Sequence, residues 1–178
     1  TMMQFDAGTD DSGLNKCQRW ALIALQILIG WHFFYEGLAK LLNPYWSSAG
    51  YMGEAEWWLG GFFRDLAASP SAVAVVDFLN IWGLTLIGLA LFLGLLTRPA
   101  LIAGMILLLL YYVAAPPFPA YSYPMPAEGS YLVVNKVLIE FMAMGVLFAF
   151  SSHRLFGLDR LIPWPGTSKH HAKSEGAA

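Results

Sequence analysis

The sequence predicts an all-α integral membrane protein, a four-helix transmembrane bundle with both termini in the cytoplasm. The 178 residues are 57% hydrophobic and only 12% charged, with a mean hydropathy of +0.54. A soluble domain carries roughly 25% charged residues, so lipid must replace much of the missing polar surface. Four apolar runs come close to the roughly 20 residues that a helix needs to cross a bilayer. The placement of the basic residues gives the orientation.

The bundle is predicted over residues 16–162, after a disordered polar tail at 1–15. Its first span covers about 17–42 and ends before Pro44, because proline cannot continue a helix. Residues 43–71 are too polar to span and rich in tryptophan and phenylalanine, which predicts an aromatic external loop. Two arrangements fit this loop equally well. It lies at the lipid headgroups, in part as a short amphipathic helix, or it packs on the protein as a lid.

The second and third spans are predicted at about 72–96 and 99–115, joined by a tight turn before Pro99. Gly83, Ala90 and Gly94 fall close to one helix face, where small residues let helices approach closely. Ala100 and Gly104 form a similar pair in the third span. Five prolines exclude a helix from 116 to 126, and the fourth span follows at about 131–150. Residues 163–178 read as a flexible C-terminal tail.

Basic residues gather at the termini and at the turn between the second and third spans. The two longer loops are acidic or nearly uncharged. The excess of positive charge marks cytoplasmic segments, so both loops are expected outside the cell. The predicted location is the inner (cytoplasmic) membrane, in multi-pass form. The basic residues are Lys16, Arg19, Arg98, Arg154 and Arg160.

With this orientation, the ionisable and amide side chains of the spans fall in one layer near the external face. His32, Glu36 and Lys40 recur every fourth residue and therefore share one face of the first helix. The other spans add Asp77, Asn80, Tyr111, Lys136 and Glu140 at the same depth. Charged groups inside a membrane span are costly, and they usually face a bundle interior or a water-filled cavity.

Two interpretations of this layer remain open. In the first it is a ligand site in which Glu36 and Glu140 exchange protons and His32 donates to a carbonyl oxygen, as a quinone site requires. Lys40, Asp77, Asn80, Tyr111 and Lys136 would then line the site. In the second the charges are ion pairs that fix the bundle, and Lys40 and Asp77 extend toward the interface.

Composition excludes several other classes. There is no basic patch for nucleic acid. Cys17 is the only cysteine, so a dithiol cannot carry electrons, and any redox role needs a quinone or a bound cofactor. No metal or haem site is evident, because His32 is the only histidine within a span.

Three stretches resemble the DoxX/DoxD family of membrane proteins, which includes the small subunit of thiosulfate:quinone oxidoreductase. They are GWHFFYEGLAKLLNP at 30–44, GLTLIGLALFLGLLTRPALIAG at 83–104 and NKVLIEFMAMGVLFAFSSHRLFGLDRLI at 135–162. The phrases in common are Gly37 to Lys40, Gly94 to Arg98, and Gly157 to Asp159. One position departs from the family pattern, since Leu84 stands where many relatives have an acidic residue.

The resemblance implies a four-helix membrane bundle that works beside a redox partner. The leading hypothesis is therefore a membrane subunit of a quinone-linked redox complex, surrounded by lipid and bound to other protein subunits. It is not a complete enzyme, since these side chains alone build no redox centre. The alternative is a non-catalytic structural or assembly subunit of a larger membrane complex. A small transporter ranks last, because four spans would have to oligomerise to form a path.

Overall fold

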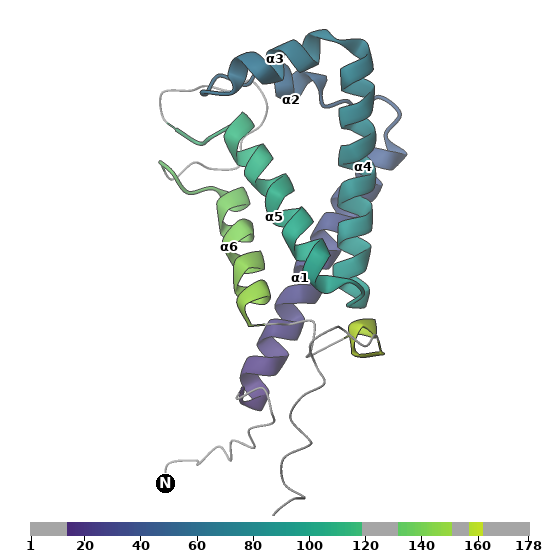
Figure 1. Ribbon diagram of the computed structural model, residues 1–178, viewed down its shortest axis with the longest axis vertical. Helices are drawn as coiled ribbons and strands as arrows, with labels where there is room; N and C mark the ends of the chain where they lie inside the picture. The colour runs from purple at the N-terminus through teal and green to yellow at the C-terminus, as the bar shows by residue number, and fades with distance from the viewer. Residues whose placement is uncertain (1–13, 119–131, 151–156, 162–178) are drawn as a thin grey trace, which may run out of the picture.

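The computed structural model describes residues 14–118, 132–150 and 157–161, and the regular elements of this part of the chain are all helices. Four long helices form a bundle, and two short helices, α2 and α3, lie across one end of it (Figure 1). We call this the α2/α3 end. Of the polar tail predicted at 1–15, residues 1–13 lie outside the described residues, as do the proline-rich segment from 119 on and the tail at 163–178.

Helices α1 (Lys16–Leu42) and α4 (Pro70–Leu93) form the closest pair in the bundle. Asn15 caps α1, because its side chain accepts a hydrogen bond from the backbone of Gln18 while the Gln18 side chain accepts one from Asn15. Glycines permit the close approach. A Cβ on Gly88 would collide with the backbone of Phe34, and one on Gly37 would collide with Thr85.

The contact between α1 and α4 is formed at Gly88 and not at Gly83, which the sequence predicted. Gly83 has open space where a Cβ would stand, whereas Gly88 touches α1. Gly94 ends α4 by adopting a left-handed conformation, with φ of 62°, so α4 stops at Leu93 and not at 96. It also begins two residues early, because Pro70 fits the first turn of a helix. Small residues in a span thus serve different purposes that spacing alone does not separate.

Helices α5 (Thr97–Ala114) and α6 (Lys136–Ala149) pack against each other and complete the bundle. α5 begins before Pro99, which lies in the first turn, where its missing N–H costs nothing. The fourth span was predicted to start near 131. Instead α6 starts at Lys136, because Leu132 has a φ of 65° and the Asn135 side chain caps the helix by accepting from the backbone of Leu138.

Three helices among the described residues, α1, α4 and α5, are long and apolar enough to cross a membrane. Large apolar side chains such as Leu28, Phe78 and Ile106 are exposed on their outer faces, as expected of residues in contact with lipid. The 14 residues of α6 extend about 21 Å, less than the roughly 30 Å of a hydrocarbon core. The chain is therefore a membrane protein with three candidate spanning helices.

The 43–71 segment contains α2 (Ala49–Gly53) and α3 (Gly60–Ala68), which pack on the ends of α4 and α5. Met52, Phe63 and Ala114 are buried in this contact, as a lid on the protein requires. Trp58 and Phe62 are 70% and 57% exposed, as expected at a headgroup layer. The segment thus has one aromatic face packed on the bundle and another exposed, and its position at the lipid headgroups stays a prediction.

At the opposite end, a short 3₁₀ helix (Leu158–Leu161) holds the α4–α5 turn. The buried carboxylate of Asp159 accepts hydrogen bonds from the backbone of Leu96 and of Thr97, both at 2.7 Å. Asp159 also donates its own N–H to the Gly94 carbonyl at 2.8 Å. Gly157, with φ of 97°, packs directly on Gly94. The Gly94 to Arg98 phrase and the Gly157 to Asp159 phrase therefore form one structural unit.

We expect Asp159→Asn to lower the thermal stability of the purified protein. The amide keeps one acceptor oxygen and loses the other, and a hydrogen bond to a charged group contributes about 1.5–3 kcal/mol. The negative charge at the start of α5 is lost as well. Unfolding in mild detergent, followed by size-exclusion chromatography, measures the effect. Asp65→Asn is the matched control, because Asp65 is exposed on α3. Equal stability of the two variants would contradict this role.

Candidate functional site

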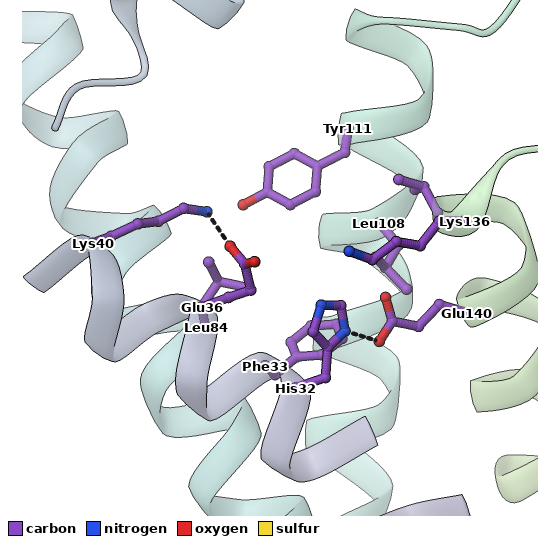
Figure 2. Close-up of a pocket in the computed structure, with 10 residues that line it drawn as sticks. His32, Phe33, Glu36, Lys40, Leu84, Leu108, Tyr111, Lys136 and Glu140 are labelled. Carbon is purple, nitrogen blue, oxygen red and sulfur yellow. Dashed lines mark hydrogen bonds and ion pairs between the residues drawn. The ribbon is translucent and has the colours of Figure 1, made fainter. Parts of the chain in front are cut away.

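A pocket of about 160 Å³ lies inside the bundle, near the α2/α3 end (Figure 2). All four long helices contribute to it. Its apolar part is formed by the buried Phe33, Leu84 and Leu108, together with Val137. The polar side chains that line it are His32, Glu36, Lys40, Tyr111, Lys136 and Glu140. An apolar pocket with a few converging polar groups is the usual form of a small-molecule site.

His32 and Glu140 join α1 to α6 across this pocket. Nδ1 of His32 lies 2.6 Å from Oε1 of Glu140. An ionised carboxylate only accepts, so Nδ1 carries the hydrogen. Figure 2 shows the second ring nitrogen turned toward the open space beneath Tyr111. The pair therefore fixes the orientation of the ring, and the second nitrogen donates to a ligand when both ring nitrogens carry a proton.

Lys40 forms the upper edge of the pocket and is held on several sides. Its Nζ donates to Oδ1 of Asn80 at 3.2 Å and lies 3.8 Å from Oε2 of Glu36. The rings of Trp46 and Tyr111 flank the ammonium group at 5.0 and 5.6 Å. Cation–π contacts of this kind stabilise a partly buried charge. Lys40 thus links α1, α4, α5 and the segment that follows α1.

Asn80 and Asp77, both on α4, play different parts. Asn80 is buried behind Lys40, and its Nδ2 donates to the Tyr111 hydroxyl at 2.6 Å. Asn80 therefore positions two side chains that line the pocket. Asp77 lies apart and accepts hydrogen bonds from the backbone and hydroxyl of Ser48 at 2.7 and 2.5 Å. It fixes the segment before α2, and it does not line the pocket.

Lys136 and Glu36 stand on opposite walls, and the two differ in their surroundings. Lys136 comes from the first turn of α6, and Figure 2 shows its side chain extending over Glu140. Glu36 pairs with Lys40 through the spacing of four residues, yet its side chain is 45% exposed. The carboxyl group of Glu140 is more enclosed, at 12% exposed. Of the two proposed proton-exchanging carboxylates, Glu36 thus lies at the edge of the pocket and Glu140 lies in its interior.

One buried polar residue escaped the sequence analysis. Gln26 is fully buried on α1, and its Nε2 donates to the Leu91 carbonyl at 3.0 Å, near the end of α4. The half of the bundle away from α2 and α3 was expected to be almost wholly apolar. In the sequence, a single amide side chain within a long apolar run could have indicated a buried polar contact at Gln26. Within the described residues, no group of three or more histidine, cysteine or acidic side chains could hold a metal.

These features define a helical membrane protein with a polar pocket between its long helices. The DoxX family model matches residues 21–116, more than half of the chain, and the chain belongs to the DoxX family. The matched region includes His32, Glu36, Lys40, Asn80 and Tyr111 and ends before α6, so Lys136 and Glu140 lie beyond it. The comparisons found no match among curated proteins and none among solved structures.

Proposed function

We propose that this chain is a membrane subunit of a quinone-linked redox complex, and that the pocket binds the quinone head group. The observation that carries the proposal is the His32–Glu140 pair, which holds an imidazole over an apolar floor inside the bundle. A quinone carbonyl oxygen accepts a hydrogen bond from the second ring nitrogen when the ring is doubly protonated, as an imidazolium. The buried Phe33, Leu84 and Leu108 suit the flat, apolar face of the quinone ring, whose polar groups are its carbonyls.

The reaction needs two electrons and two protons for each quinone reduced to quinol. The electrons come from a separate donor, either a redox partner subunit or a small external molecule such as thiosulfate, because these side chains alone build no redox centre. The second ring nitrogen of His32 supplies one proton to a carbonyl oxygen, and Glu140 balances the positive charge on the ring. Glu36, which is more exposed, gives the second proton to the other quinone oxygen and takes up a replacement from the surroundings.

The proposed setting is the cytoplasmic membrane, with four spans, both termini inside and the α2/α3 end outside. The clustering of basic residues at the termini and at Arg98 supports this orientation. In this arrangement α6 supplies the fourth crossing together with its flanking apolar residues. The pocket then lies in the outer leaflet, where a donor from outside the cell can reach a bound partner subunit.

Purification in a gentle detergent from the native host tests the proposal. We expect quinone to be extracted with the protein and a redox partner to co-elute, both identified by mass spectrometry. Donor-dependent quinone reduction should require the chain. Two results together would overturn the proposal. The purified protein would contain no quinone, and donor-dependent quinone reduction would continue unchanged in a complex that lacks this chain.

The alternative is a structural or assembly subunit, and the surroundings of Lys40 favour it. Its ammonium group already has an amide, a carboxylate and two aromatic rings as neighbours, which is how a residue that clamps a bundle is held. On this account the chain co-purifies in fixed stoichiometry with a larger complex. Glu36→Gln then leaves the activity of the correctly assembled complex unchanged.

A further inference from the structure

The pocket is closed toward the α2/α3 end and toward the core. Above it, Lys40 donates to Asn80, Asn80 donates to the Tyr111 hydroxyl, and the Trp46 ring covers the ammonium group. The Tyr51 hydroxyl secures this layer by donating to the Tyr111 carbonyl at 2.8 Å. A ligand that came from the loop side would have to break these contacts.

The side of the pocket between α1 and α6 is different. Glu36 and His32 lie on this edge of α1, and their side chains are 45% and 33% exposed. Figure 1 shows α1 and α6 diverging toward the α2/α3 end. On the same edge of α1, further from α2 and α3, Leu25 packs against the core. The opening is therefore confined to the level of His32 and Glu36.

On the α1 side, this opening lies within a helix that is long and apolar enough to cross a membrane. Glu36 lies six residues before the end of α1, about 9 Å along a spanning helix. Exposed side chains on the turns of α1 around and before Glu36 are apolar or aromatic, with Leu28 66% and Tyr35 58% exposed. Such residues are typical of a helix surface in contact with lipid and its interface.

We infer that the ligand enters the pocket sideways from the bilayer, between α1 and α6, with its polar ring inside and its apolar tail in the lipid. The volume supports this division, because a pocket that encloses a drug-sized ligand has about 300–1,000 Å³, whereas this one has about 160 Å³. The inference rests on the proposed function only for the identity of the ring. The route itself follows from the exposed edge.

Carboxyl-reactive probes of different solubility test the route. The full-length protein in membrane vesicles is treated with lipid-soluble dicyclohexylcarbodiimide or with a water-soluble carbodiimide, and adducts are located by mass spectrometry. We expect the lipid-soluble reagent to modify Glu36 severalfold faster. Glu56, exposed between α2 and α3, should show the opposite preference and acts as the internal control. Faster modification of Glu36 by the water-soluble reagent would overturn the inference.

A substitution outside the pocket provides a second test of the same opening. Ala39 is exposed on α1 and lies three residues from Glu36, hence beside it on the helix surface. We expect Ala39→Trp to slow the modification of Glu36 by the lipid-soluble reagent severalfold. Ala74→Trp, at an exposed position on α4, should leave the rate unchanged. Equal rates in the two variants would contradict the lateral route.

The two proposals fail in different ways. Protection of Glu36 by an added long-tailed quinone reports on the ligand, and the preference between reagents reports on the route. Faster modification from the lipid phase without protection would support the opening and overturn the quinone. Protection combined with faster modification from water would support the quinone and overturn the lateral route.

Discussion

Glu140→Gln is expected to lower donor-dependent quinone reduction by about 10² or more, because a positioned acid or base typically contributes 10²–10⁴-fold. The amide can still accept a hydrogen bond from His32, so the pocket keeps its shape. It has no charge to balance an imidazolium ring, and the donor that faces the quinone is lost. Activity of the purified complex, normalised to the amount of assembled chain, measures the effect.

Glu56→Gln is the matched control, because this carboxylate is exposed at the α2/α3 end and away from the pocket. Its activity should equal that of the unmodified complex. If Glu140→Gln also retains full activity while the complex assembles normally, the His32–Glu140 pair acts only as a link between α1 and α6. The alternative function as a structural subunit would then be favoured.

Gly88→Ala is expected to give the largest loss of stability from a single methyl group. The added Cβ would collide with the backbone of Phe34 on α1 and with the Gly30 carbonyl, neither of which can rotate away. Overpacking of this kind costs about 1–3 kcal/mol. The α1–α4 pair must then separate, which also moves Phe33 and Leu84 at the floor of the pocket.

Gly83→Ala provides the control on the same helix, since its Cβ would stand in open space. This substitution should raise stability slightly, because alanine is favoured over glycine within a helix by about 0.5–1 kcal/mol. Thermal unfolding in detergent compares the two variants. Equal losses would show that the α1–α4 contact does not depend on close approach at Gly88.

Much of the fold follows from periodicity and composition. The long apolar runs mark the spanning helices, and the spacing of four residues places His32, Glu36 and Lys40 on one face. The start of α6 was harder to predict from the sequence, because Leu132 to Val134 continue the apolar pattern although the backbone is not helical there. Asn135, a residue type that often caps helices, indicated the true start of α6, but the prediction followed the hydropathy of the preceding residues.

Which polar groups meet depends on how each helix is rotated about its axis, and one sequence carries little information about that. The ion pairs expected in the second interpretation could lie within a helix or between helices, and Glu36–Lys40 is one within α1. His32 instead contacts Glu140 on α6, and Asp77 contacts Ser48. Likewise, spacing pointed to Gly83, while the crossing of α1 and α4 places Gly88 at the contact. Packing between the helices determines which of these side chains and glycines are in contact.

The central claim is that a quinone ring occupies the pocket between α1 and α6. A photoreactive quinone, with the reactive group on its ring, tests this claim most directly in membranes that contain the full-length protein. We predict that mass spectrometry locates the label on peptides containing His32 to Lys40 or Lys136 to Glu140, and that excess unlabelled quinone prevents it. Labelling confined to the lipid-facing surface of α4, or labelling that excess quinone does not reduce, would contradict the claim.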